Sequence, residues 1–229
     1  YTTLFRSTLR PEDRTILGRA VCVAEGIAKQ FGHYCEVLVH SLEDPESSIM
    51  EIYNGHVTGR EQGGPMTDFA LSLLDKKETK EDVFGPYYSS TADGKRLKST
   101  TTVLRNEFGE AIGFLCINLD ISAPVDSFLK ELLPDTAGVQ SVTEHYPLTA
   151  KDLVDNAFRS ALEAVHNRTG ISPTQKNKIV VEDLYRRGIF HVKNGVDLVA
   201  DLLGVSRYTV YNYIREVKQS LGDTDIDRL

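Results

Sequence analysis

The chain of 229 residues has no tryptophan, two methionines and three cysteines, and no apolar run approaches the roughly 20 residues that span a bilayer. Cys22, Cys35 and Cys116 are odd in number and widely spaced, which excludes a disulfide framework and a zinc-binding cysteine pattern. Cys116 lies in an apolar run, so we expect a buried, inert thiol there. The first residues lack the basic stretch followed by an apolar stretch that is typical of a secretory signal peptide. The sequence therefore predicts a cytoplasmic protein that does not enter a membrane.

The charge is unevenly distributed along the chain. The net charge is −7, but residues 172–220 hold eight Lys and Arg against five Asp and Glu, which leaves the rest strongly acidic. A mildly basic module joined to an acidic one is what a DNA-binding domain with a separate control domain shows. This asymmetry in charge is modest, and taken alone it can also have no functional meaning.

The first half of the chain predicts an α+β domain. A one-sided apolar pattern with Pro11 in its first turn predicts a helix that ends at Gly32. A second helix, capped by Thr67, covers Phe69 to about Lys77. Short runs rich in β-branched residues, the first of them alternating, predict strands at Tyr34–His40, Ser48–Tyr53, 86–92, 95–106 and 111–120. This order predicts an antiparallel sheet with flanking helices.

The second half predicts an all-α domain. A short helix around Val125–Leu133 is followed by a segment with few apolar anchors, so we place domains at 1–133 and 149–229, with a linker at 134–148. Helical patterns then cover 149–168, 172–187, 195–203 and 206–220. In the first turn of the second of these helices, Ser172 and Gln175 form a capping-box pattern.

A helix-turn-helix is predicted at 195–217. Ala200 is small where two helices must cross, Gly204 suits a sharp turn with positive φ, and Ser206 can cap the second helix. Apolar contacts between the helices are expected from Val199, Leu203, Val205, Val210 and Tyr213 or Ile214.

The outer face of the second helix is predicted to bind a double-stranded DNA operator. Arginine pairs with guanine and asparagine with adenine, while tyrosine hydroxyls mostly contact phosphate. The candidate residues are Ser206, Arg207, Tyr208, Thr209, Tyr211, Asn212 and Arg215. The alternative is an ordinary helical hairpin whose polar side chains face solvent. Arg186 and Arg187 can touch phosphates or simply stabilise the C-terminal end of their own helix.

Several runs resemble the YheO-like PAS family of bacterial regulators. They are Asn54–Arg60 with Gly64–Asp68, Lys98–Asn106 with Ile112–Asn118, and the closing segment from Gly188 to Ile214. The resemblance extends over nearly the whole chain in the same order. It implies a PAS-like sheet, a homodimer, and control, as a repressor for example, of a nearby catabolic or transport operon.

The Gly-rich loop from His56 to Asp68 is the candidate ligand site of this domain. The hypothesis is that Asp68, with His56 or Asn118, meets the polar ends of an amino-acid-like small molecule, and that Arg60 binds its carboxylate. The alternative is structural: Asp68 caps a helix and Arg60 pairs with a neighbouring acid.

The residue pattern gives no evidence for a catalytic, metal-binding or cofactor-binding site. His56 and Asp68 form a conceivable acid/base pair, but no Ser or Cys nucleophile sits at a recognisable elbow. The histidines His33, His40 and His56 lack metal-ligand spacing. We therefore expect a dimeric regulator whose small-molecule effector shifts operator binding. Two alternatives stay open: a PAS-like domain that serves only dimerisation or a protein partner, and an enzyme with a helical appendage.

Overall fold

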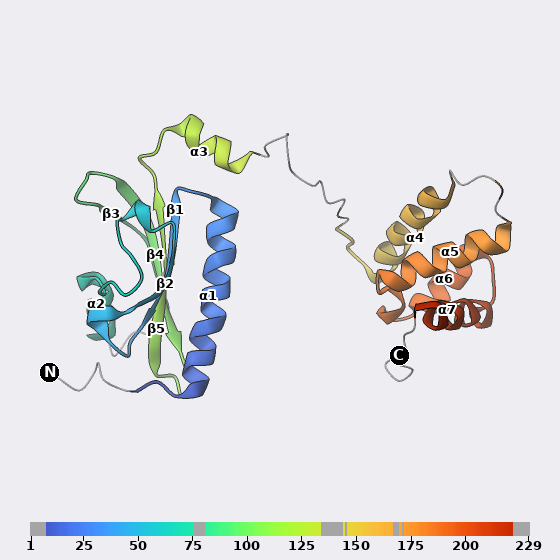
Figure 1. The fold of residues 1–229 in the computed structure, drawn as a ribbon, viewed down its shortest axis with the longest axis horizontal. Coiled ribbons are helices and arrows are strands. Elements are labelled where there is room, and N and C mark those ends of the chain that lie inside the picture. The colour runs from blue at the N-terminus through green and yellow to red at the C-terminus, as the bar shows by residue number, and fades with distance from the viewer. Residues whose placement is uncertain are drawn as a thin grey trace. The chain divides into compact units, whose positions relative to one another are not determined.

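The computed structural model of the protein describes residues 8–75, 81–133, 144, 146–166, 170 and 172–221 (Figure 1). The chain divides into two compact units, Tyr1–Val139 and Gln140–Leu229, which are described one at a time. Most of the expected linker at 134–148 lies outside the described residues, as do the last residues of the helices predicted to end near 77 and 168. Within the described ranges, no helix has both the length and the apolar character to cross a membrane.

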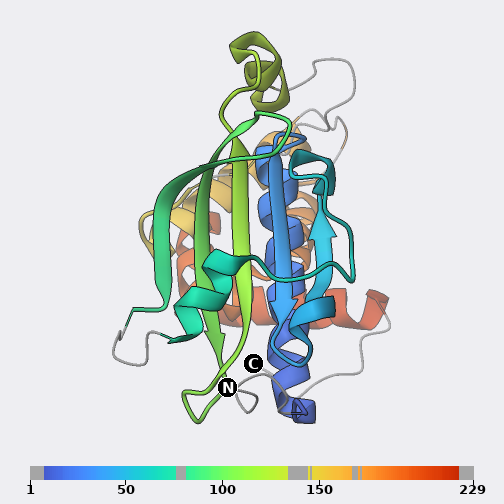
Figure 2. The same ribbon diagram turned by 90° about the vertical axis from the view of Figure 1, so that its left-hand side faces the viewer.

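The N-terminal unit is built on a five-stranded antiparallel sheet in the order β2-β1-β5-β4-β3 (Figure 2). Its strands are β1 (Cys35–Ser41), β2 (Ile49–Tyr53), β3 (Val83–Ser90), β4 (Arg96–Arg105) and β5 (Ala111–Asp120). β5, the last strand in sequence, lies between β1 and β4 in the middle of the sheet. The prediction of an antiparallel α+β fold is confirmed, with the strand expected at 86–92 beginning three residues earlier.

Helix α1 (Pro11–Phe31) packs on one face of the sheet. Leu17 and Ala24 on the helix are fully buried in one cluster with Val37 and Val39 of β1. The approach is close at Gly113 of β5, where an added Cβ would lie 2.6 Å from the Cδ2 atom of Leu17. Small residues on both surfaces therefore set how near the helix lies to the sheet.

The opposite face is covered by the segment that runs from η2 (Gly55–Val57) to α2 (Asp68–Asp75) (Figures 1 and 2). Leu38 and Phe114 of the sheet pack there against Ala70 and Leu73 of α2. Consequently all residues of β1 are buried, including Glu36 and His40. The alternation of β1 in the sequence thus does not correspond to an exposed face, because both faces of the strand are covered.

The remaining elements of the N-terminal unit are short. They are η1 (Pro45–Ser47) between β1 and β2, and α3 (Val125–Leu132) after β5. A tight loop follows β4: the side-chain oxygen of Asn106 accepts hydrogen bonds from the backbone N–H groups of Phe108 and Glu110, both at 3.0 Å. This Asx-type turn connects β4 to β5.

The C-terminal unit is a helical domain with one apolar core. Its elements are α4 (Ala150–His166), α5 (Pro173–Arg186), η3 (Ile189–His191), α6 (Gly195–Leu203) and α7 (Arg207–Leu221). Fully buried Val154, Val180, Leu184 and Val199 join α4, α5 and α6 around this core. The predicted capping box is formed, since the Ser172 hydroxyl accepts from the backbone N–H of Gln175 at 3.3 Å and α5 starts there.

Candidate DNA interface and ligand cavity

The turn between α6 and α7 has the geometry that its sequence predicts. Gly204 has φ +66°, a left-handed conformation that costs glycine little. The N–H of Val205 donates to the carbonyl of Ala200 at 3.0 Å, and Ala200 itself is buried. The chain therefore reverses within three residues and crosses α6 closely, as in a helix-turn-helix.

The hydroxyls at the start of α7 are used within the protein. The Ser206 Oγ atom accepts a hydrogen bond from the backbone N–H of Thr209 at 3.1 Å, which confirms the predicted cap. The Thr209 hydroxyl lies 2.9 Å from the same Oγ atom. Ser206 and Thr209 thus stabilise the first turn, and each keeps limited capacity for an external contact.

The other candidates on α7 differ in exposure. Tyr208 and Tyr211 are 70% and 52% exposed, and Arg207 and Arg215 are also exposed. Asn212 is half-buried, and its side-chain oxygen accepts a hydrogen bond from Arg215 at 3.0 Å. The structure therefore brings two tyrosines and two arginines together on one exposed helix, with Asn212 partly screened beside them.

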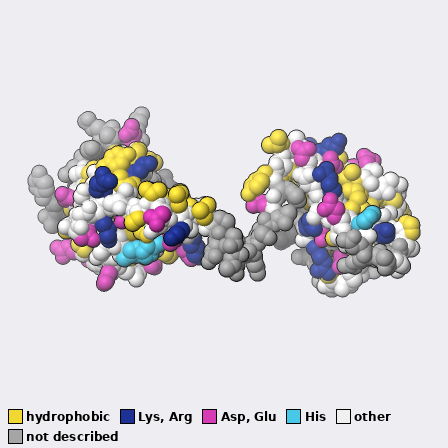
Figure 3. Space-filling view, turned by 90° about the horizontal axis from the view of Figure 1, so that it is seen from above, with side chains coloured by type: hydrophobic (Ala, Val, Ile, Leu, Met, Phe, Trp, Pro, Cys, Tyr) yellow, Lys and Arg dark blue, Asp and Glu magenta, His cyan; other side chains and the backbone are white. Residues whose placement is uncertain are grey.

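Many bases of this unit are paired with acids, and Figure 3 shows the two charge types interspersed on its visible face. Arg207 forms an ion pair with Asp197 of α6 at 2.6 Å. Arg186 and Arg187 pair with Glu182 and Asp183 one helical turn earlier, at 2.8 Å each. The structural role expected as the alternative for these two arginines is thus present. Sequence reasoning missed Asp197, because its contact with Arg207 depends on the turn.

In the N-terminal unit, a cavity of about 350 Å³ lies between the sheet and the segment that covers it. We call it the sheet cavity. It is lined by the predicted residues Arg60, Asp68 and Asn118, and by side chains that were not predicted, among them His40, Tyr87 and Ser99. The sequence separates these residues widely, and the strand register brings them together.

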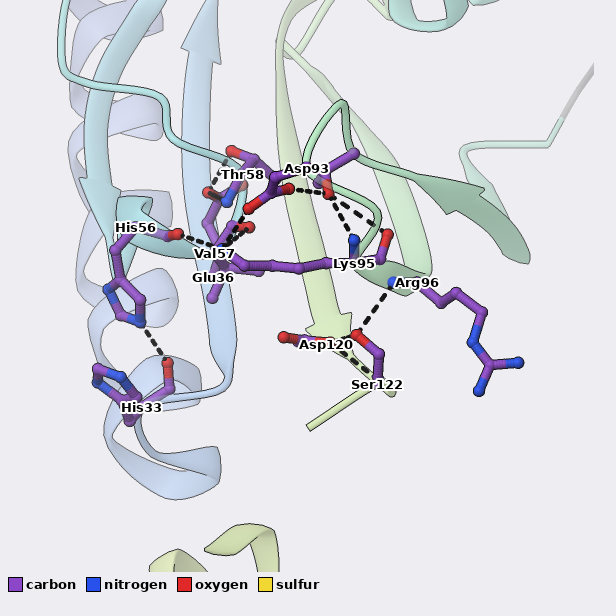
Figure 4. A network of polar contacts seen from close by, with 11 residues as sticks. His33, Glu36, His56, Val57, Thr58, Asp93, Lys95, Arg96, Asp120 and Ser122 are labelled. Carbon is purple, nitrogen blue, oxygen red and sulfur yellow. Dashed lines mark hydrogen bonds and ion pairs between the residues drawn. The ribbon is translucent and has the colours of Figure 1, made fainter. Parts of the chain in front are cut away.

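A fully buried carboxylate, Glu36, organises the floor of this cavity. Its Oε1 atom accepts hydrogen bonds from Arg60 Nη2 at 2.7 Å and from Asn118 Nδ2 at 2.8 Å. Its Oε2 atom accepts from the backbone N–H of Thr58 at 3.2 Å and from the Thr58 hydroxyl, which is visible in Figure 4. A buried charge is tolerated when it is paired and hydrogen-bonded, and Glu36 meets both conditions.

Arg60 is held in place by this carboxylate and still has free donors. Its Nε atom donates to the Thr58 hydroxyl at 2.9 Å, and one N–H of Nη2 donates to Glu36. Within the described residues, the other three of the five guanidinium N–H groups have no partner, and they lie on the edge formed by Nη1 and Nη2. The side chain is 22% exposed at the cavity. The ion pair expected as the structural alternative exists, and it leaves an edge that can bind a carboxylate.

Asp68 lies at the mouth of the cavity as the first residue of α2. The helix is capped by Thr67, whose hydroxyl accepts from the backbone N–H of Ala70 at 3.3 Å. The Asp68 carboxylate accepts from the N–H of Phe69 at 2.8 Å and is otherwise exposed. The cap is thus the predicted Thr67, and the charge of Asp68 is open to a ligand.

His56 is not among the residues that line the sheet cavity. Its ring stacks on that of His33, with centroids 4.0 Å apart, and its Nε2 atom lies 3.0 Å from the His33 carbonyl oxygen (Figure 4). The structure therefore separates His56 from Arg60, Asp68 and Asn118, although His56 and Arg60 are four residues apart in sequence.

Three groups that line the cavity have shifted pKa values: His40 and Cys116, which are buried, and Tyr87, which is half-buried. Burial lowers the pKa of His40 to about 4, and the positive charge of Arg60 acts in the same direction. Burial raises the pKa of the Cys116 thiol to about 11, in agreement with an inert thiol. The Tyr87 hydroxyl, whose pKa burial also raises, lies 2.9 Å from the Thr101 hydroxyl. At neutral pH these floor groups are thus uncharged. Within the described parts of the chain, no three His, Cys, Asp or Glu side chains are placed to hold a metal ion.

Comparison with known proteins assigns both units. A family model described as a YheO-like PAS domain matches residues 11–134, and one described as an HTH domain matches residues 157–215. An uncharacterized protein of Haemophilus influenzae is 36% identical over 208 residues, which cover 91% of this chain and 94% of that protein.

Two named relatives match over similar lengths. YheO of Escherichia coli is 35% identical over 213 residues, 91% of this chain and 89% of YheO. The transcriptional regulator DauR of Pseudomonas aeruginosa is 28% identical over 209 residues, 88% of this chain and 93% of DauR. The chain therefore belongs to the YheO-like PAS domain family, in which the PAS-like unit is followed by a helix-turn-helix domain.

Proposed function

We propose that the protein is a ligand-responsive transcription regulator that acts as a homodimer in the cytoplasm. In this proposal α7 is the recognition helix, and a small amino-acid-like effector binds in the sheet cavity. Binding of the effector favours one arrangement of the dimer and so alters its affinity for the operator.

The observation that carries the DNA-binding part is the exposed side of α7 behind a tight, glycine-containing turn. Arg207, Tyr208, Tyr211 and Arg215 project from a helix whose other side, at Val210 and Ile214, is buried in the core. A rigidly held helix with arginines and tyrosines on its free face is suited to the major groove. Two-fold symmetry then predicts a pseudo-palindromic operator with half-sites about one helical turn apart, or a multiple of it.

The sheet cavity supports the sensing part. Arg60 offers an edge of free N–H groups to a carboxylate, and Asp68 offers a negative charge to an ammonium group. With buried Glu36 balancing Arg60, the site carries one excess negative charge, which disfavours anions and suits a zwitterion. Its volume is within the range typical of small-molecule pockets.

A second candidate role for the PAS-like unit is dimerisation, or binding of a protein partner, without a ligand. The polar lining of the sheet cavity is evidence against this role. A pure dimerisation domain has no need of a cavity in which a fully buried carboxylate, Glu36, holds a partly buried arginine, since burying such groups costs free energy.

DNA binding is tested by titrating the full-length protein against a duplex of the region upstream of its own gene, at several salt concentrations. We expect affinity to fall steeply as salt rises, because phosphate contacts release counterions. Arg207→Ala should weaken binding by about tenfold or more. The matched control is Arg105→Ala, which removes the same charge from the N-terminal unit and should leave affinity unchanged. Salt-independent binding, or equal loss in both variants, contradicts the proposal.

Ligand sensing is tested by thermal shift and titration calorimetry with D- and L-amino acids and related metabolites. A ligand at 100 times its dissociation constant should stabilise the folded protein by about 2.7 kcal/mol. Arg60→Gln should remove this shift. If no compound raises the unfolding temperature, dimerisation or binding of a protein partner becomes the better supported role of the PAS-like unit.

A further inference from the structure

Two side chains in the sheet cavity have hydrogen-bonding capacity that the protein itself does not use. They are His40 on β1 and Ser99 on β4, which are 1% and 2% exposed and both line the cavity. Neither was singled out by the sequence, and neither takes part in the network around Glu36.

The orientation of the His40 ring follows from its neighbour Ser48. The Nδ1 atom lies 2.8 Å from the Ser48 Oγ atom, and the Ser48 hydroxyl donates to the carbonyl of Gly64 at 3.5 Å. Either atom of the His40–Ser48 pair can be the donor, so Ser48 occupies Nδ1 in both neutral tautomers of the ring. The Nε2 atom carries a lone pair in one tautomer and a proton in the other, and makes no hydrogen bond with any described residue. Because the pKa of His40 is lowered to about 4, the ring is neutral at pH 7.

Ser99 is the second group. Its Oγ atom is buried and forms no hydrogen bond within the ordinary distance and angle limits in the described part of the chain, although a weak interaction with the Tyr87 hydroxyl acts to lower the pKa of that tyrosine. The hydroxyls of Tyr87 and Thr101 lie 2.9 Å from each other and form the stronger bond. A buried hydroxyl with so weak a partner is unfavourable, so its retention in a cavity wall points to a ligand that supplies a better bond.

The strand register places the two groups at different levels of the floor. Ser99 lies opposite Asn118 of β5, and so does Glu36, which holds Arg60. His40 lies opposite Phe114, four residues further along β5, or about 13 Å at 3.3 Å per residue. Ser99 is therefore level with the guanidinium that would bind the carboxylate, and His40 is at the far end.

We propose that Ser99 binds the head group of the effector and that His40 forms a hydrogen bond through Nε2 with the tip of its side chain, so the effector is an amino acid with a long side chain that ends in a hydrogen-bonding group. This inference rests on the proposed function, in which Arg60 and Asp68 hold the carboxylate and the ammonium group. A long aliphatic side chain of the same shape would displace water from Nε2 without replacing the hydrogen bond, and such sites discriminate strongly against the analogue that lacks the polar group.

The experiment is titration calorimetry on the full-length protein with matched pairs of amino acids, each in both enantiomers. The pairs are glutamine with homoleucine, lysine with 2-aminoheptanoate and, as short controls, serine with 2-aminobutyrate. We expect at least one long polar member to bind, and its apolar partner to bind at least about tenfold more weakly. The short pair should show no such preference, because neither member reaches His40.

Two variants separate the roles of the two side chains. His40→Phe, which keeps the ring, should abolish the preference within the long pair. Ser99→Ala should weaken both members of that pair by about three- to tenfold and leave the preference intact. The control is Thr102→Val, which removes a hydroxyl from the opposite face of β4 and should change neither quantity. Should His40→Phe not fold, the preference within the long pairs in the unchanged protein still decides the matter.

The possible failures are distinguishable. Equal affinity for the two members of every long pair that binds overturns this inference and leaves a sensor of amino acids in place. Binding of the corresponding amines without a carboxylate overturns the proposed role of Arg60, and with it the head-group assignment. Absence of binding by every pair overturns the amino-acid class itself, and this inference with it.

Discussion

Arg207, the first residue of α7, lies 2.6 Å from the carboxylate of Asp197 on α6, and both side chains are exposed. The residue best suited to contact a guanine or a phosphate is therefore held against the preceding helix in the free protein. Any contact of Arg207 with DNA either breaks this ion pair or uses the carboxylate to orient the guanidinium.

Asp197→Asn should raise the affinity for non-specific DNA by about two- to fivefold at low salt. Exposed ion pairs contribute up to about 1 kcal/mol, so their loss frees the arginine at small cost. Asp201→Asn is the control, because it removes the same charge from the same helix. Binding is measured by fluorescence anisotropy with a random duplex. If the two variants bind equally well, net charge accounts for the change and the ion pair is irrelevant.

Glu36→Ala should lower the free energy of unfolding of the N-terminal unit by about 3–5 kcal/mol, because breaking a buried pair leaves Arg60 without its partner. Glu43→Ala removes the acid of an exposed pair with Arg14 that has the same 2.7 Å separation, and should cost less than about 1 kcal/mol. Hydrogen exchange of β1 peptides during urea titration measures both. Similar losses in the two variants contradict the assigned role of burial.

Stability should fall in acid because of His40. The native pKa of about 4 lies below the ordinary value of 6.5, so the unfolded chain binds the proton first as pH drops. The contribution of His40 is complete above pH 6.5 and declines towards pH 4, by up to about 1.4 kcal/mol per pH unit. Urea unfolding at pH 7 and pH 5 should therefore differ less in His40→Leu than in the unchanged protein. Parallel pH dependences in the two proteins would refute this assignment.

Two glycine substitutions should differ in cost because their surroundings differ. Gly113→Ala places a Cβ 2.3 Å from the carbonyl oxygen of His40, which forces strand or helix to shift, and should cost about 1–3 kcal/mol or more. Gly204→Ala meets nothing within 4 Å, so its cost is the positive φ alone, about 1 kcal/mol. Circular dichroism on thermal unfolding measures both. A larger loss at Gly204 would contradict this account of the turn.

The helix-turn-helix could be predicted because its signals are local. The small residue Ala200, the glycine Gly204 and the cap residue Ser206 lie close together in the sequence. Each of them suits one particular place in the motif. The sheet was also predictable from short β-branched runs and turn residues. Strand ends shifted by up to three residues, since pairing with a neighbour decides where a strand begins.

The sheet cavity was harder to predict, because its lining residues are far apart in the sequence and only the register of the paired strands brings them together. Glu36 and Ser99 both lie opposite Asn118, on strands that the sequence separates by dozens of residues. The available signal for Glu36 was that it is the one acid in β1, beside the apolar run Val37–Val39. His56 was assigned to the cavity from its closeness to Arg60 in sequence, whereas the η2 turn directs its ring to His33.

The central place of β5 has a consequence for synthesis on the ribosome. β1 and β4 are joined through a strand that ends at Asp120, so neither can complete its pairing until that residue has left the exit tunnel. Until then the apolar cluster around α1 and β1 lacks the residues that β5 contributes, as in any fold dominated by distant contacts. The N-terminal unit is therefore exposed to chaperones and to aggregation for most of its own translation, and it closes in a late, cooperative step.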